Sequence, residues 1–275
     1  MPKKKSDRRP PLADNVQRFG SHWAIRNHSP QTFKEYERYL GQLFTKFPSP
    51  AQADVEAWLA AETSISVRRM KARSLRAFGK WSTNTGDDRL SWWKHIPLPK
   101  EPEKEQITVT LAEYLEIRAR KLDPIVRLIV ELLWSTGVRR TELAQLLVND
   151  VNLEERTILV RTSKTDEPRY VPITEEAAVE ISRHLQNHTD RRLIGRSSEA
   201  IRKLLKRREI PSAHPWRRGW AVDSLMSGLN EVSVRTAAGW RSGAMVARYT
   251  KKHKQRVAMS DFRKLRGKAT GNDAA

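Results

Sequence analysis

Residues 123–143 read DPIVRLIVELLWSTGVRRTEL and contain a very apolar segment followed by a turn. Asp123 and Pro124 suit the first turn of a helix, and Gly137 can end that helix in the left-handed conformation. We therefore predict a helix from Pro124 that stops near Gly137. A side chain placed just after such a stop can face a ligand instead of the core, and Arg139 occupies this position.

The residues on either side of this segment predict that the second half of the chain is mostly helical, with one small sheet. Thr110 and Glu113 have the spacing of a capping box, which marks a helix start. Two β-branched-rich runs joined by a polar turn predict an antiparallel hairpin. The predicted strands cover residues 156–161 and 169–173, and the further helices cover residues 174–187, 198–208, 215–228, 233–239, 243–250 and about 254–266.

The first hundred residues predict an all-helical domain. Ser29 and Pro30 suit the start of a helix. Prolines at positions 48 and 50 end this helix, and a shorter one follows. A third helix is predicted from about Ser64, and no strand pattern precedes residue 100. The fold class predicted for the whole chain is therefore mainly α, in two domains.

Composition places the boundaries between these parts. Residues 97–105 contain three prolines and alternating charges, as an extended interdomain linker does. The predicted layout is a basic flexible arm (1–14), a helical domain (15–96), a linker (97–107), a second domain (108–267) and a short tail (268–275).

Charge is large and unevenly distributed. The chain has 52 Lys and Arg against 32 Asp and Glu, which gives a net charge of +20. Residues 1–100 and 201–275 have cation surpluses of 10 and 13, whereas residues 101–200 have three more acids than bases. Two basic flanks around a near-neutral middle predict two surfaces that bind one polyanion, and we expect nucleic acid.

The third predicted helix carries many cations. Between Arg68 and Lys80 it has no acidic residue, which disfavours an ordinary solvated surface. Apolar residues on one side and cations elsewhere suit a helix that packs on a core and faces a DNA backbone. The candidate DNA-binding residues are Arg68, Arg69, Lys71, Arg73, Arg76 and Lys80.

Several classes of protein are disfavoured by what the sequence lacks. Without cysteine, it predicts no disulfide framework and no thiolate metal site. It has no apolar run long enough to span a bilayer and no signal-peptide pattern at its start. We expect a cytoplasmic, DNA-associated protein that uses no cofactor or metal and has no membrane partner. The basic cluster at residues 3–9 suits a nuclear signal or an arm that contacts phosphates.

Five side chains in the second domain offer a metal-free chemistry for phosphodiesters. Arg139 and Arg217 can bind phosphate oxygens with paired N–H donors, and His214 can transfer protons near neutral pH. Lys164, in the predicted hairpin turn, can protonate a leaving oxygen, and Tyr249 can act as a nucleophile. Each residue alone also has an ordinary structural explanation, so the prediction depends on their combination.

The order of these residues resembles that of the tyrosine recombinase, or phage integrase, family. Residues 136–143 look like the family's Thr-Gly-x-Arg-x-x-Glu-Leu box, which selects Arg139 over Arg140. His214 and Arg217 match its His-x-x-Arg motif. Together these matches identify the two arginines that the family uses.

The remaining motifs of the family are also matched. Residues 160–173 look like its β-hairpin, with Lys164 as the hairpin lysine, and Tyr249 follows Trp240 at the family spacing. The resemblance covers about residues 108–266, and residues 15–95 look like the family's core-binding, DNA-binding domain.

Trp240 is a departure from the commonest pattern. Most members have histidine at this position, and the Cre-like members are similar to this chain in using tryptophan. An indole N–H can donate to a phosphate oxygen, but it cannot exchange protons. The expected role of Trp240 is orientation, which leaves proton transfer to His214 and Lys164.

The resemblance implies a site-specific recombinase. Arg139 and Arg217 would clamp the scissile phosphate and stabilise the charge of the transition state. Tyr249 would attack phosphorus and leave a 3′-phosphotyrosine and a free 5′-hydroxyl. Lys164 would be the general acid, and His214 the base or proton shuttle.

The resemblance also implies partners. The two domains would form a clamp on duplex DNA, and four protomers would exchange strands through a Holliday junction. Glu142 would support the catalytic residues. The last predicted helix, with Val257, Phe262 and Leu265 as its apolar positions, suits packing on a neighbouring protomer or within its own chain.

Three other functions remain compatible with parts of this pattern. A strand transferase of topoisomerase or hairpin-forming type would use the same site. A DNA-binding protein of the same fold could have lost catalysis, although every catalytic position is filled. A hydrolytic phosphodiesterase is disfavoured because the sequence offers no Cys/His/Asp metal cluster.

Overall fold

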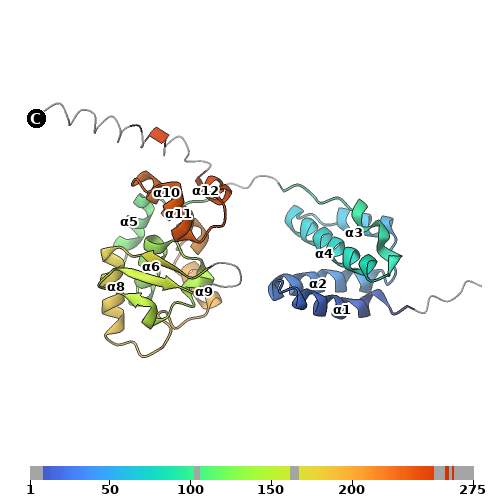
Figure 1. The fold of residues 1–275 in the computed structure, drawn as a ribbon, viewed down its shortest axis with the longest axis horizontal. Coiled ribbons are helices and arrows are strands. Elements are labelled where there is room, and N and C mark those ends of the chain that lie inside the picture. The colour runs from blue at the N-terminus through green and yellow to red at the C-terminus, as the bar shows by residue number, and fades with distance from the viewer. Residues whose placement is uncertain (1–8, 102–105, 162–166, 251–257, 260–261, 263–275) are drawn as a thin grey trace, which may run out of the picture. The chain divides into compact units, whose positions relative to one another are not determined.

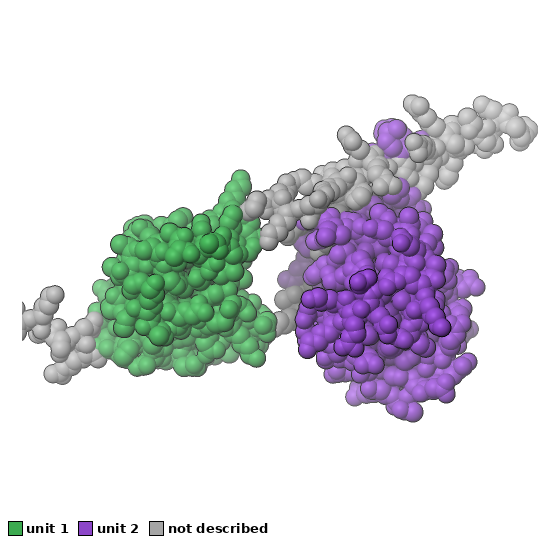
Figure 2. Space-filling model, turned by 180° about the vertical axis from the view of Figure 1, so that it is seen from behind, with its two compact units in different colours: residues 1–104 green, residues 105–275 purple. Residues whose placement is uncertain are grey.

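A computed structural model of the protein describes residues 9–101, 106–161, 167–250, 258–259 and 262. The chain forms two compact units, residues 1–104 and 105–275, each with its own buried core (Figure 2). Helices dominate both units, and the described residues contain one three-stranded antiparallel sheet, in the second unit (Figure 1). The predicted fold class, mainly α with a small antiparallel sheet, is confirmed.

The first unit is built around one long helix, α4 (Ile65–Asn84). Helices α1 (Leu12–Ile25), α2 (Pro30–Lys46) and α3 (Gln52–Ala60) pack on it, and so does the 3₁₀ helix η1 (Asp88–His95) (Figure 1). Apolar side chains at helical spacing on these elements meet in a single core. The fully buried members of this core are Leu43, Val55, Ala72, Leu75, Phe78, Leu90 and Ile96.

The starts of α2 and α4 follow from their capping residues. The Ser29 and Ser64 hydroxyls accept hydrogen bonds from the backbone N–H groups of Thr32 and Val67, as capping serines do. Pro30 occupies the first turn of α2. Both predicted helix starts are therefore confirmed.

Helix α1 corrects the prediction of a flexible arm over residues 1–14. It begins at Leu12, because Leu12, Val16 and Phe19 recur at helical spacing and are buried in the core of the unit. Three residues of the predicted arm are thus helical.

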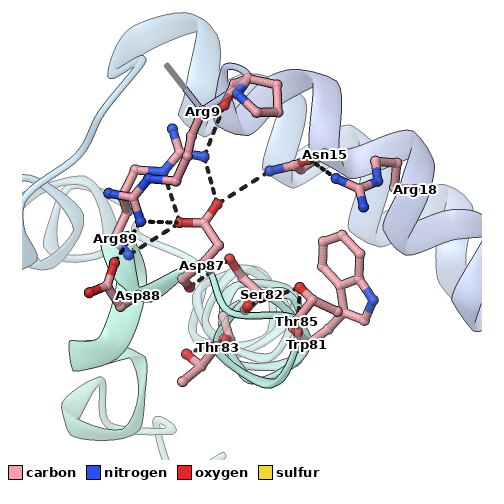
Figure 3. Close-up of polar contacts among 12 residues, drawn as sticks. Arg9, Asn15, Arg18, Trp81, Ser82, Thr83, Thr85, Asp87, Asp88 and Arg89 are labelled. Atoms are coloured by element: carbon pink, nitrogen blue, oxygen red, sulfur yellow. Dashed lines mark hydrogen bonds and ion pairs between the residues drawn. The ribbon is translucent and has the colours of Figure 1, made fainter. Parts of the chain in front are cut away.

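Ion pairs fix the residues that precede α1 (Figure 3). Arg9 binds the Asp88 carboxylate at 2.7 Å. Arg89 donates one hydrogen bond to the carbonyl oxygen of Pro10 and others to the Asp87 carboxylate. The folded unit therefore begins no later than Arg9, and the rest of the predicted arm lies outside the described residues.

The second unit has the apolar helix α6 (Pro124–Thr136) at its centre, and the sequence predicts the bounds of this helix. It contacts α5 (Leu111–Ala119), α8 (Glu175–Leu185) and α10 (Ala213–Met226). Its side chains from Leu128 to Leu133 are all buried, including one carboxylate. The capping box predicted before α5 is also present.

The sheet has the strand order β1-β2-β3 and is antiparallel throughout. Strands β2 (Thr157–Val160) and β3 (Arg169–Pro172) form the predicted hairpin. Strand β1 (Val151–Asn152) was not predicted, because two residues are too short to show an alternating pattern. Val160 pairs with Arg169, and these two residues form the pair nearest the hairpin turn.

The remaining elements of the second unit are α7 (Arg140–Leu143), η2 (Val148–Asp150), α9 (Ser198–Arg207), α11 (Glu231–Ala238) and α12 (Gly243–Thr250). Helices α10, α11 and α12 pack against one another around a small separate core. Its buried members are Trp220, Ala221, Val234, Ala238, Trp240 and Val246.

Some predicted features fall outside the part of the chain that the structure describes. They include the hairpin turn at residues 162–166 and most of the helix predicted near residues 254–266. Among the helices within the described ranges, none has the length and apolarity that crossing a bilayer requires.

Candidate active site

The turn after α6 sets the position of Arg139. Gly137 ends α6 with a φ of +57°, and a Cβ at this position would lie 2.5 Å from the ring of Trp220. Only glycine meets both conditions without strain. The chain then continues to Arg139, the residue at the N-terminal cap of α7.

Glu142 holds Arg139 through two contacts. The Arg139 backbone N–H donates to Oε2 of Glu142 at 2.7 Å, and Nη1 of Arg139 donates to Oε1 at 2.6 Å. One carboxylate thus caps a helix start and orients a guanidinium. Glu142 is fully buried, whereas the Arg139 side chain is 30% exposed and accessible to a ligand.

Arg169, on β3, binds the same carboxylate and was not singled out from the sequence. Its Nη1 and Nη2 donate to Oε1 and Oε2 of Glu142 at 3.3 and 3.0 Å, and its Nε donates to the carbonyl oxygen of Ala237 at 2.8 Å. Its side chain is only 7% exposed. One signal was available: Arg169 shares a strand face with the buried Val171, and a cation on such a face needs a partner.

Arg217, on α10, joins the ends of two other helices. Its Nη1 donates to the carbonyl oxygen of Gly137 at 2.6 Å, and its Nη2 donates to the carbonyl oxygen of Ala238. These carbonyls lie at the ends of α6 and α11, where the helix dipole favours a cation. The Arg217 side chain is 1% exposed, and its Nη1 lies 4.0 Å from Oε2 of Glu142.

Three guanidinium groups therefore surround one carboxylate. Burial alone would raise the pKa of Glu142. Burial is outweighed by hydrogen bonds from Arg169 and from the Arg139 backbone, and by the charges of Arg169 and Arg217. Together these interactions lower the pKa of Glu142 below its ordinary value. Glu142 is thus ionised at neutral pH, and three cations against one anion favour binding of a further anion such as a phosphate.

His214 lies in the first turn of α10, close to this cluster. Partial loss of solvent and then four nearby guanidinium charges lower the pKa of His214 below its ordinary value. These charges are, in order of effect, those of Arg218, Arg217, Arg140 and Arg139. His214 nevertheless remains exposed to solvent, and its neutral form can accept a proton at neutral pH.

Trp240 packs beside Arg217 in the small core of α10, α11 and α12. The Cζ atom of Arg217 lies 5.0 Å from the centre of the Trp240 ring. Gly239, which precedes Trp240, has a φ of +64°, and a Cβ there would lie 3.0 Å from Nη1 of Arg169. The turn that carries Trp240 is therefore closely fitted to Arg169 and Arg217.

The other two predicted catalytic side chains are not described. Lys164 lies in the segment 162–166, outside the described residues. The backbone of Tyr249 belongs to α12, three residues after Val246, which is buried beside Trp240. The structure thus brings together Arg139, Glu142, His214, Arg217 and Trp240, and places the helix that bears Tyr249 against the same core.

The predicted DNA-facing surface of α4 is partly corrected. Lys71 is 9% exposed, its Nζ lies 2.9 Å from Oε2 of Glu62, and it stacks on the ring of Trp58. It belongs to the interior of the unit. The acidic partner was missed because Glu62 precedes α4, outside the segment whose lack of acids supported the prediction.

The other five cations of α4 differ in what they contact. Three are half-buried and donate to backbone carbonyl oxygens: Arg68 to Glu62, Arg69 to Pro99 and Arg76 to Ile96. Arg73 and Lys80 are exposed and lie seven residues apart, on the same face of the helix. These two remain the most accessible candidates for a phosphate contact.

Comparison with known proteins gives the same family by sequence. The sequence profile of the phage integrase family matches residues 103–256, more than half of the chain. Tyrosine recombinase XerA of Pyrococcus horikoshii is 26% identical over 182 residues, which cover 65% of this chain and 62% of that protein. Tyrosine recombinase XerA of Thermococcus kodakarensis is 29% identical over 281 residues, covering 92% of this chain and 94% of that protein. The chain spans about three-fifths of the Pyrococcus relative that it matches.

A solved structure gives the same fold. The crystal structure of a lambda integrase dimer bound to a COC′ core site aligns with a TM-score of 0.73 at 16% identity, covering 87% of this chain and 77% of that one. Within the described residues, no three His, Cys, Asp or Glu side chains are grouped as a metal site requires. From the profile match over more than half of its length, the chain belongs to the phage integrase family.

Proposed function

We propose that this protein is a site-specific DNA recombinase that cleaves and rejoins duplex DNA through a 3′-phosphotyrosine intermediate. The observation that carries this proposal is the cluster of Arg139, Arg217 and His214 around the buried Glu142. Such a cluster suits a phosphodiester, because it has surplus positive charge and a proton acceptor. Family membership and the net charge of +20 support the same substrate class.

In the proposed reaction, the two arginines bind the non-bridging oxygens of the scissile phosphate. The guanidinium of Arg139 is ordered by Glu142 and that of Arg217 by two helix-end carbonyls, so little reorganisation is required when charge develops. Neutral His214 accepts the phenolic proton of Tyr249, directly or through water. Trp240 orients Arg217 through ring contact and transfers no proton.

The covalent step exchanges one phosphoester bond for another. The Tyr249 oxygen forms a bond to phosphorus, and the bond from phosphorus to the 5′-oxygen breaks. Lys164 is the proposed donor of the proton that the leaving oxygen takes up. The reverse step with another 5′-hydroxyl rejoins the strand, because the bond energy is retained in the phosphotyrosine.

Duplex DNA is the proposed partner of both units. A lambda integrase, which shares the fold, has been crystallised as a dimer on its core site. We propose that four copies of this protein assemble on two recombination sites and exchange strands through a Holliday junction, in the cytoplasm. The predicted domain layout, with residues 15–96 as the core-binding domain and residues 108–267 as the catalytic domain, belongs to this proposal.

The proposal is tested with a nicked suicide DNA substrate, which traps the covalent intermediate. We expect wild-type protein to form a protein–DNA adduct that resists denaturation, and Tyr249→Phe to form none. Tyr170→Phe is the matched control, because Tyr170 is an exposed tyrosine on the outer face of β3 and should leave adduct formation unchanged. The DNA is a pool of duplexes that carry random core sequences, so that the result does not depend on one chosen site.

The outcomes separate the possible functions. Adduct formation in Tyr249→Phe would mean that the nucleophile is another residue. DNA binding without any adduct would favour a protein that has lost catalysis. Adducts on any sequence, with relaxation of supercoiled DNA and no exchange between duplexes, would favour a strand transferase of the topoisomerase type.

A further inference from the structure

We propose that Arg169 is a positioning residue of this reaction, which orients the catalytic arginines through Glu142 and links them to two further parts of the site. The inference rests on the proposed function. The side chain of Arg169 binds the Glu142 carboxylate and the carbonyl oxygen of Ala237, and we infer that it acts through these two groups.

The first link is to the carboxylate that orders Arg139. Arg169 binds both oxygens of Glu142, and Nη1 of Arg139 donates to one of them. Two-point binding by a planar guanidinium fixes the rotation of a carboxylate, which a single contact leaves open. The direction in which Arg139 presents its guanidinium therefore depends on Arg169.

The second link is to the turn that carries Trp240. Nε of Arg169 donates to the carbonyl oxygen of Ala237, and three atoms of its side chain lie 3.0–3.2 Å from where a Cβ of Gly239 would be. The neighbouring carbonyl, that of Ala238, accepts from Arg217. Arg169 and Arg217 thus hold consecutive peptide units at the end of α11.

The third link is to the β-hairpin. Arg169 pairs with Val160, and these two residues form the β2–β3 pair nearest the hairpin turn. Arg161, the residue directly after β2, binds both oxygens of the Asp150 carboxylate at 2.6–2.9 Å. Arginine–carboxylate pairs therefore hold both strands at the base of this turn.

A positioning role accounts for a cation on a buried strand face. A buried ion pair adds little net stability compared with well-packed apolar residues, because both charges must lose their water. By this argument, stability alone does not require a cation on the strand face that Arg169 shares with Val171. Arginine at position 169 is instead the residue that reaches Glu142 and Ala237 at the same time, which an apolar side chain cannot do.

The test separates positioning from folding by comparing DNA affinity with the rate of the covalent step. Wild-type protein, Arg169→Lys and Arg169→Met are mixed with saturating suicide DNA, and adduct formation is followed in a single turnover. Arg183→Met is the control, since Arg183 is an exposed arginine of the same unit that pairs with Glu180 on α8. The folded fraction of each variant is measured by circular dichroism at the assay temperature.

We expect the rate constant to fall at least tenfold in Arg169→Lys and further in Arg169→Met, while the DNA dissociation constant changes less than threefold. Lysine retains the charge but cannot bind both carboxylate oxygens and Ala237 together. Arg183→Met should react at the wild-type rate. If Arg169→Met does not fold, the comparison rests on Arg169→Lys.

A double-variant cycle shows whether Arg169 acts through Glu142. The double variant Arg169→Met/Glu142→Gln should react more slowly than wild type by a factor smaller than the product of the factors measured for the two single variants. Three outcomes would each overturn the inference. The first is a double variant whose rate falls by the full product of the single factors. The others are a wild-type rate in folded Arg169→Lys, or a fall in rate that only matches the fall in folded fraction. If wild-type protein itself forms no Tyr249-dependent adduct, it is the proposed function that fails.

Discussion

Glu142 illustrates how a single buried charge links stability to pH. Its contacts with Arg169 and Arg139 lower its pKa despite burial. The stabilisation is therefore fully present above the pKa of an unfolded-state glutamate, about 4.3. It is lost as the pH falls from there through the lower folded-state pKa, because the unfolded chain binds the proton first.

We expect Glu142→Gln to lower the free energy of unfolding by about 3–5 kcal/mol at pH 7, since it leaves buried cations without their counter-ion. The difference from wild type should shrink as the pH falls below about 4.3. Urea denaturation of both proteins at pH 7, 5 and 3.5 measures this difference in the free energy of unfolding. Glu199→Gln, which alters an exposed pair with Arg202, should change little. A difference that does not vary with pH would contradict an ionised Glu142.

At the scale of one element, α4 shows that cations on a single helix have separate roles. Lys71 is held inside the unit by Glu62 and Trp58, whereas Arg73 and Lys80 face solvent. A cation that contacts a DNA phosphate displaces a condensed counter-ion, so it contributes to the salt dependence of binding. A buried cation does not, but its removal destabilises the fold because it leaves its acidic partner, here Glu62, without a counter-ion.

We expect the double variant Arg73→Ala/Lys80→Ala to bind DNA more weakly and to reduce the slope of log K against log salt concentration by about 2. Lys71→Met should leave this slope unchanged and lower the stability of the first unit. Fluorescence anisotropy between 50 and 300 mM salt, with labelled duplex, measures the slope. An unchanged slope in the double variant would mean that α4 does not contact the DNA backbone.

At the scale of the whole molecule, each unit has its own core. Leu75 is fully buried in the first and Leu128 in the second. Removing either side chain to the β-carbon leaves a cavity inside the core of its own unit. Local stability should therefore respond unit by unit.

We expect Leu75→Ala and Leu128→Ala each to cost about 2–5 kcal/mol. Hydrogen exchange measured by mass spectrometry should show faster exchange in peptides of residues 12–96 for the first variant and of residues 109–216 for the second. Gly41→Ala is a suitable control, because nothing lies within 4 Å of a Cβ at this helical position. Faster exchange in both units for either variant would mean that the two units unfold together.

Local signals in the sequence were reliable where a few neighbouring residues decide the structure. The starts of α2, α4 and α5 follow from capping side chains, and the end of α6 follows from a glycine in the left-handed conformation. The start of α1 was placed too late, because its apolar pattern follows a basic, proline-containing segment that suggested disorder. Strand β1 has too few residues to show a period.

Partners that are distant along the chain were not predictable from local pattern. The pairing of Arg169 with Glu142 spans 27 residues, and the bond from Arg217 to the Gly137 carbonyl spans 80. Likewise, Lys71 appeared to be part of a DNA-facing surface because its acidic partner lies before the helix. In each case the burial of a charge depends on elements that meet only after folding.

The sequence by itself determined the fold class, the family and the identity of the candidate catalytic residues. Helix caps and apolar periodicity depend on neighbouring residues, and the order of the motifs is read directly along the chain. Only the tertiary structure decided how those residues are held. It placed Glu142 among three guanidinium groups, buried Arg217 between two helix ends and brought Arg169 to the site from the sheet. The physical reason is that a charge is buried only with its partner, and packing decides which partner comes within reach.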